Sequence, residues 1–300
     1  MSATAADSSL SGLKSILVAT DLSSRSDKAV ARGLSLAARF GARVKVVHVV
    51  DDDQPQALVD LEVARTAELL EESVRPFASR FSITPEIEIA KGIESEAIRA
   101  VADVMNADLL VLGAHRRQFL RDVFTGTTVE RVIRTSGRPV LMVRLDSKLS
   151  YETAVAAVDL SRSSLDALEF ASSASFLGCT SLILLHAYMP LASGFMRYAS
   201  VGEEQIEDYS RSLANEALSA LEGVANTTPL AGLSPELLVE EGGAVEVIGE
   251  VIASRSPQLV VMGTAGNSML KNVLIGSVAN AILRDAECDV LAYAGRPQAG

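Results

Sequence analysis

The chain has 300 residues, of which 48% are hydrophobic and nine are proline, so it can bury a large core and has the length of two domains rather than one. Its net charge of −11 and isoelectric point near 4.9 argue against a nucleic acid or an anionic membrane as the main partner. Both of those partners require a surplus of lysine and arginine. An anionic ligand would therefore have to be bound locally.

The N-terminal segment, residues 1–14, lacks the basic start and apolar stretch of a targeting signal, and we expect it to be a short flexible tail. No stretch of the sequence approaches the length of a membrane span, which predicts no membrane insertion. Cys179 and Cys288 lie far apart in apolar surroundings, which is typical of reduced thiols in a core. Together these features predict a cytoplasmic protein.

Short apolar runs alternate along the chain with longer helical stretches, which is typical of βαβ units and a parallel sheet. In the first half we expect strands near residues 15–20, 43–50, 84–90, 107–113 and 139–143. In the second half we expect them near residues 154–159, 181–188, 235–240, 258–263 and 289–294. The prediction is an α/β fold of two tandem, doubly wound, five-stranded parallel-sheet domains.

The helices between these strands carry their own start and stop signals. Ser23 or Ser24 can cap the first helix of the first half, and Ser161 or Ser163 can cap the corresponding helix of the second half. Pro76 and Pro139 are expected at or near helix ends, because proline cannot continue a helix without losing a hydrogen bond.

The two halves are internal repeats. A D-L-S sequence followed by a helix and a histidine-containing strand occurs twice, with Asp21 matching Asp159 and His48 matching His186 at the same offset. Further along, Gly113 matches Gly263 and Gly126 matches Gly276 at an offset that is twelve residues larger. We place the first domain at residues 15–147 and the second at 148–300, with the boundary in the polar stretch 145–151.

The second half carries an insertion around residues 189–205, between its second strand and second helix, and the insertion is unusually apolar for a loop. Packing against the other half is the favoured interpretation, and a lid over a ligand is the alternative. The fifth strands of both halves are also apolar and would be sheet edges, which proteins usually cover. We therefore expect the halves to pack together through their fifth strands.

Two recurring features converge where ligands bind to open parallel sheets, in the crevice beyond the carboxyl ends of the strands. Asp21 and Asp159 follow the first strands, and glycine-containing loops follow the fourth strands. Glycines allow the backbone to approach a phosphate, and the next helix presents its positive N-terminus to the anion. The loop "GTAGNSMLKNVLIGS", residues 263–277, is thus expected to hold a polyphosphate largely by main chain. The alternative for each Asp is a turn former or helix cap.

The spacing of Gly263, Gly266, Gly276 and Ser277, which is G, two residues, G, nine residues, G and Ser, resembles the nucleotide-binding pattern of the universal stress protein family. The two halves together resemble a tandem member of that family. This resemblance implies the Rossmann-like fold of the adenine nucleotide alpha hydrolases. It also implies an adenine nucleotide ligand, ATP or else AMP or ADP, with Mg²⁺ if the nucleotide is a triphosphate.

The resemblance implies roles for individual residues of the second half. Asp159 would hold the adenine or ribose end, and the backbone at Ala187 would contact adenine. The ribose and phosphates would lie against Gly263, Gly266, Gly276, Ser277 and Val278.

The first half offers a second, less favoured set of positions, which are Asp21, Val49, Gly113, Arg116, Gly126, Thr127 and Thr128. Arg116 stands where the second glycine of the pattern should be. Because a side chain there occupies space that the motif leaves to the ligand, we expect the first half to bind nucleotide poorly or not at all. Against this, the arginines of that loop are good ligands for some other anion.

The remaining reactive residues give no catalytic or metal constellation. His48 and His186 lie in apolar strands, which favours structural histidines with a satisfied hydrogen bond. No zinc-ligand spacing and no P-loop motif is present in the sequence.

Three functions stay open on the sequence. The first, and the favoured one, is a nucleotide-dependent regulatory module of a stress response, with an unidentified protein partner and the two domains forming an intramolecular pseudo-dimer or a homodimer. The second is a slow ATPase or self-phosphorylating protein, although no residue set for hydrolysis is evident. The third is a scaffold or a binder of an apolar, lipid-like ligand.

Overall fold

The structure is a computed structural model that describes residues 12–114, 127–148, 150–230, 232–265 and 275–295. The strands are β1 (Ser15–Ala19), β2 (Arg43–Val50), β3 (Glu86–Lys91), β4 (Leu109–Gly113), β5 (Val140–Val143), β6 (Thr153–Ala157), β7 (Ser181–Tyr188), β8 (Glu236–Glu241), β9 (Leu259–Gly263) and β10 (Asp289–Tyr293). The helices are α1 (Ser26–Phe40), α2 (Gln56–Phe81), α3 (Glu94–Val104), α4 (Thr128–Ser136), α5 (Arg162–Ser173), α6 (Ala192–Tyr198), α7 (Glu203–Thr227), α8 (Ala244–Arg255) and α9 (Ser277–Asp285). The predicted strands are confirmed with small shifts at their ends.

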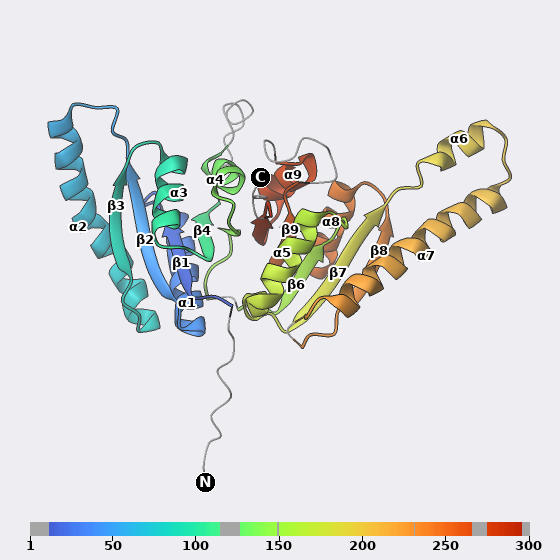
Figure 1. Cartoon of the computed structure of the whole chain (residues 1–300), viewed down its shortest axis with the longest axis horizontal. Helices are drawn as coiled ribbons and strands as arrows, with labels where there is room; N and C mark the ends of the chain where they lie inside the picture. The colour runs from blue at the N-terminus through green and yellow to red at the C-terminus, as the bar shows by residue number, and fades with distance from the viewer. Residues whose placement is uncertain (1–11, 115–126, 149, 231, 266–274, 296–300) are drawn as a thin grey trace, which may run out of the picture.

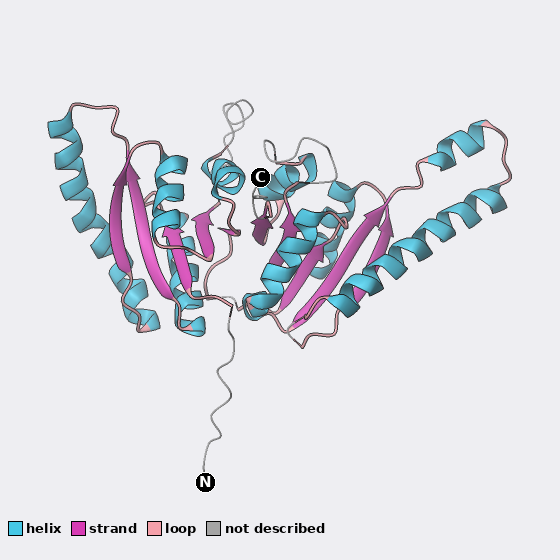
Figure 2. Cartoon of the chain, viewed as in Figure 1, coloured by secondary structure: helices cyan, strands magenta, loops and turns pink. Residues whose placement is uncertain are grey.

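Within the described residues, the ten strands form one sheet in the order β3-β2-β1-β4-β5-β10-β9-β6-β7-β8 (Figures 1 and 2). Each half is parallel, and its strand order reverses direction between the first and fourth strands. β5 and β10 pair antiparallel at the centre, with Leu141 opposite Leu291. The expected contact between the fifth strands is therefore present. Neither of these two apolar strands is left as an exposed edge.

Alternation along the strands sends side chains to two hydrophobic layers. In β1, Ile16 and Val18 face the layer that α1, α2, α5 and α7 cover. Leu17 and Ala19 face the opposite layer, which α3, α4, α8 and α9 cover. Because both faces are buried, the strands are nearly continuous apolar runs, which is typical of a doubly wound α/β fold.

The predicted helix signals are confirmed only in part. The expectation that Ser23 or Ser24 is the N-cap of α1 is wrong, because Arg25 is the N-cap of that helix and its side chain makes no capping hydrogen bond. Ser161 caps α5 as expected, because its Oγ accepts a hydrogen bond from the amide of Ser164.

The expectation that Pro76 lies near a helix end is wrong, since α2 continues to Phe81. Leu70 and Val74 before the proline are buried in the core, and Phe77 after it packs against the same core. This packing outweighs the loss of one backbone hydrogen bond at the proline.

The insertion of the second half forms α6 and the start of α7, and the expectation that it packs on the other half is wrong. β7, which precedes it, lies next to the edge strand β8, on the side of the sheet remote from the β5–β10 seam. Figure 1 shows α6 beside α7 at the end of the molecule opposite the first half. Leu191, Phe195 and Tyr198 stay exposed there.

Candidate functional site

A pocket opens in the second half where the strand order reverses, beyond the carboxyl ends of β6 and β9. Its volume is about 370 Å³, within the usual range for small-molecule sites. Most of the residues that the sequence proposed for this half line it together, namely Asp159, Ala187, Gly263, Gly276, Ser277 and Val278. Gly266 lies outside the described residues. The pocket brings together segments that are more than a hundred residues apart in the sequence.

Asp159 is positioned by the backbone on either side of it. Its Oδ1 accepts a hydrogen bond of 3.0 Å from the amide of Ser161, as in an Asx turn. The carbonyl of Val158 accepts a hydrogen bond from Nδ1 of His186 on β7, at 2.6 Å. In the first half, Nδ1 of His48 donates in the same way to the carbonyl of Thr20, at 2.8 Å. The histidines are thus hydrogen-bonded structural residues that fix the segments carrying the aspartates.

Gly263 has a packing role of its own, at the end of β9. A Cβ atom added there would lie 2.5 Å from the amide nitrogen of Ser164 on α5, which is far too close. The same comparison at Gly113 gives 3.1 Å to the Cα of Ser26 on α1. The first glycine of each loop therefore lets a strand end pack against the first helix of its half, whether or not a ligand is bound.

Gly276 is different, because it is the N-cap of α9 and has an ordinary backbone conformation, with φ of −60° and ψ of 151°. Among the described residues no side chain caps the helix, and the amide of Gly276 donates to the carbonyl of Thr264 at 2.8 Å. The first two residues of α9, Ser277 and Val278, line the pocket. An uncapped helix N-terminus with a glycine before it offers free donors and a positive dipole end to an anion.

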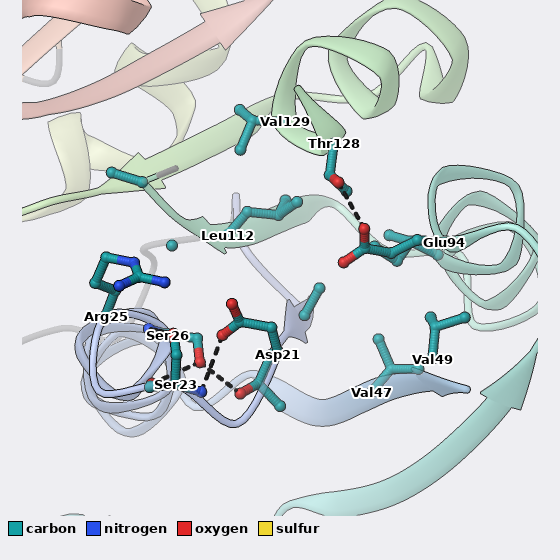
Figure 3. Close-up of a pocket in the computed structure, with 15 residues that line it drawn as sticks. Asp21, Ser23, Arg25, Ser26, Val47, Val49, Glu94, Leu112, Thr128 and Val129 are labelled. Carbon is teal, nitrogen blue, oxygen red and sulfur yellow. Dashed lines mark hydrogen bonds between the residues drawn. The ribbon is translucent and has the colours of Figure 1, made fainter. Parts of the chain in front are cut away.

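The first half has a corresponding pocket of about 240 Å³ between β1 and β4, shown in Figure 3. Asp21, Val49, Gly113 and Thr128 line it, as the sequence proposed. Thr127 is the N-cap of α4, next to the lining residue Thr128. Arg116 and Gly126 lie outside the described residues.

The helix N-terminus of this first pocket is occupied by the chain's own groups. Thr127 and Glu130 form a capping box, in which the amide of Glu130 donates to Thr127 Oγ1 and the amide of Thr127 donates to Glu130 Oε2. The hydroxyl of Thr128 donates to Glu94 Oε2 on α3 at 2.6 Å (Figure 3). Two carboxylates thus stand at the N-terminus of α4, Glu94 as a lining residue of the pocket and Glu130 in the helix cap, where the second half has Ala244 and Asn280. Both oppose an anion at this end of the pocket.

Asp21 stays in its charged form at the opposite side of the first pocket. Burial alone would raise the pKa of its carboxyl, but hydrogen bonds from Ser23 and Ser26 and the nearby charge of Arg25 lower the pKa below its ordinary value. Figure 3 shows Asp21 and Glu94 on either side of the cavity, with Arg25 near α1.

Glu94 is the site residue that sequence reasoning missed. The repeat offset that matches Gly113 to Gly263 also matches Glu94 to Ala244, the first residue of α8, which lines the second pocket. Extending the repeat alignment into these helix starts would have revealed the difference in charge. Among the described residues, no group of three or more His, Cys, Asp or Glu side chains is placed to hold a metal ion. In the same residues, no helix is both long and apolar enough to span a bilayer.

Two doubly wound halves with a pocket at each reversal of strand order define a tandem Rossmann-like α/β protein. The family model described as the universal stress protein family matches residues 12–144 and 150–294. The chain therefore belongs to the universal stress protein family, as a tandem two-domain member.

Individual relatives agree with this assignment. A universal stress protein of Methanocaldococcus jannaschii is 28% identical over 146 residues, which are 45% of this chain and 84% of the relative. Universal stress protein A homolog 2 of Coxiella burnetii is 31% identical over 111 residues, or 37% of this chain and 72% of that protein. A solved universal stress protein of Archaeoglobus fulgidus covers 94% of this chain and 98% of its own, with a TM-score of 0.68 and 17% identity. That structural likeness supports the fold alone.

Proposed function

We propose that this protein acts in a stress response by binding an adenine nucleotide, in the first place ATP, in the pocket of its C-terminal half. The bound nucleotide would regulate contact with a protein partner. Such regulation requires that the nucleotide have unequal affinities for two states of the protein, since a ligand that binds both states equally shifts nothing. Family membership supports the link to stress.

The uncapped N-terminus of α9 carries the nucleotide proposal. Gly276 has no side chain to fill the space before the helix, and Ser277 and Val278 at the start of the helix line the pocket. These groups suit the phosphates, and Ser277 adds a hydroxyl donor. Mg²⁺ would enter as part of a triphosphate ligand. The residues present therefore fit the nucleotide that the family pattern implies.

The other side of the second pocket suits the base and the ribose. Leu185, Ile248 and Met262 supply apolar surface, and Asp159 offers a carboxylate acceptor. Pockets of this kind combine apolar walls with a few polar groups that fix orientation. Adenine would lie near Ala187 and the ribose near Asp159.

We further propose that the two halves are unequal and that the first half does not take up ATP. The sequence argument rests on Arg116, and the described residues add a second one. Glu94 and Glu130 place two carboxylates at the N-terminus of α4, so a polyphosphate would meet like charges instead of free amides. Like charges within a few ångströms cost about 1 kcal/mol each even in water and more in a pocket.

Calorimetric titration of Gly276→Leu with ATP and Mg²⁺ tests the proposed phosphate site. The added side chain would block the approach of phosphates to α9, so we expect ATP binding to be lost. Gly202→Leu is a matched control, because Gly202 is also a helix N-cap, with φ of −61° and ψ of 145°, and has open space around it. Equal ATP affinity in both variants would contradict the proposal.

A further inference from the structure

The two pockets share their walls but differ at one end. The apolar wall residues of the first pocket, Val47, Val49, Ile98, Leu112 and Val129, correspond through the repeat to Leu185, Ala187, Ile248, Met262 and Ala279 of the second. Asp21 and Asp159 occupy the same place after the first strand of each half. The surfaces proposed above for the base and the ribose are thus present in both halves.

The difference lies at the end where the second pocket would receive phosphate. Glu94 lines the first pocket at the position that Ala244 occupies in the second. The carboxylate of Glu94 accepts a hydrogen bond from the hydroxyl of Thr128. The capping box of Thr127 and Glu130 already uses two of the amides at the N-terminus of α4. The first pocket is also smaller, at about 240 Å³ against about 370 Å³.

We propose that the first pocket is a separate binding site that takes a nucleoside without phosphate, and that Glu94 is the residue that excludes the phosphorylated forms. This inference rests on the proposed nucleotide site of the second half, because it assigns the shared walls to base and ribose. Asp21 and Glu94 are both acceptors, and they suit the hydroxyl groups of an uncharged nucleoside. One chain would then sense a nucleotide and a nucleoside at the same time.

The electrostatic reason for the selection is direct. A phosphate placed beside Glu94 meets a like charge, which at 4 Å costs about 1 kcal/mol in water, or about fivefold in affinity, and several times that energy in a less polar pocket. An uncharged nucleoside meets no such repulsion and can donate a hydrogen bond to the same carboxylate. The neighbouring cation, Arg25, lies near α1, toward the Asp21 side of the pocket (Figure 3).

Equilibrium dialysis of the full chain with labelled adenosine, in the presence of saturating ATP and Mg²⁺, tests the site. ATP fills the second half, so any adenosine that still binds reports the first pocket. Adenosine is titrated to saturation at this fixed ATP concentration, and we expect one adenosine per chain, with the first pocket binding ATP at least fivefold more weakly than adenosine. Absence of bound adenosine, or competition by ATP at equal strength, would overturn the inference. If ATP binds to neither half, the proposed function fails instead.

A pair of exchanges tests the role of Glu94. Glu94→Gln keeps an acceptor for Thr128 but removes the charge, and we expect the affinity of the first pocket for ATP, relative to its affinity for adenosine, to rise at least fivefold. Glu96→Gln, on the same turn of α3 but outside the pocket lining, is the control and should change neither. The reverse exchange, Ala244→Glu, should weaken ATP binding in the second half at least fivefold. If Glu94→Gln leaves competition by ATP unchanged, Glu94 does not select the ligand.

Discussion

The guanidinium of Arg32 on α1 lies 3.4 Å, from Nε to Oδ2, from the carboxylate of Asp289 on β10, and both side chains are buried. The phenol of Tyr151 donates to the same Oδ2, and the amides of Arg144 and Leu145 donate to Oδ1 at 2.7 and 2.8 Å. One carboxylate of the second half thus binds a helix of the first half and the segment that connects the halves. The hydrogen bonds to this carboxylate are charge-assisted, which strengthens the contact between the two halves.

Loss of this carboxylate should be strongly destabilising. Asp289→Ala removes one partner of the buried Arg32–Asp289 ion pair, and we expect the free energy of unfolding to fall by about 3–5 kcal/mol. Urea denaturation followed by circular dichroism measures the change. Glu287→Ala, an exposed carboxylate two residues away, should change the stability by less than about 0.5 kcal/mol. Equal effects of the two substitutions would show that the buried ion pair adds nothing.

The two buried thiols predict a loss of stability at alkaline pH. Burial raises the pKa of both Cys179 and Cys288 from 9.0 to about 12. Below pH 9 the thiols are protonated in the folded and the unfolded chain alike. Above it, the unfolded chain releases protons that the folded chain keeps until about pH 12, so stability present below pH 9 is lost as the pH rises through this window.

Each thiol should contribute about 1 kcal/mol of this loss between about pH 9.5 and about pH 10.5. Chemical denaturation of the Cys179→Ala/Cys288→Ala double variant isolates the effect, because other titrating groups are common to both proteins. We expect the variant to lose less stability than the unchanged chain over the same pH range. Parallel pH profiles would show that the thiols titrate normally.

Of the two described glycines of the second pocket, Gly263 should matter for stability and Gly276 should not. Gly263→Ala forces a Cβ atom to 2.5 Å from the amide nitrogen of Ser164, and we expect it to lower the free energy of unfolding by about 1–3 kcal/mol. Among the described residues, a Cβ atom at Gly276 meets the carbonyl of Thr264 at 3.4 Å, an ordinary contact, and the effect of Gly276→Ala on stability should stay below about 0.5 kcal/mol. Thermal denaturation without ligand compares the two. A Gly263→Ala protein as stable as the unchanged chain would contradict the packing role.

Asp159 should matter for ligand affinity beyond its local turn. Asp159→Ala removes a charged acceptor, and we expect nucleotide binding to weaken by about 1.5–3 kcal/mol. The loss of the hydrogen bond from the amide of Ser161 would add a small cost in stability. Titration with ATP measures the affinity, and Asp21→Ala in the first half is the matched control with no expected effect. Unchanged affinity in a folded Asp159→Ala protein would return this residue to the role of a turn former.

The sheet could be predicted from the sequence because the same order of strands and helices occurs twice along the chain. Each strand is a short apolar run between turn residues. The match of Asp21 to Asp159 aligns the sequences of the two halves, so each strand of one half supports the prediction of its counterpart in the other. The pairing of β5 with β10 also followed, because two apolar edge strands require cover.

Other features depended on contacts that local sequence does not show. The local preference of Pro76 predicts a helix end, but the packing of Phe77 against the core keeps α2 continuous. The position of α6 follows from the strand order, which places β7 away from the seam. The role of Glu94 appears only when α3 and α4 are brought together, since its partner Thr128 is thirty-four residues away.

The number of ATP molecules that the full chain binds tests the central claim most directly. Calorimetric titration with ATP and Mg²⁺ should show one site per chain, which belongs to the pocket at α9 and disappears in Gly276→Leu. Two sites of equal affinity would contradict the inequality that Glu94 and the capping box of Thr127 and Glu130 impose on the first half. No site at all would contradict the nucleotide assignment itself.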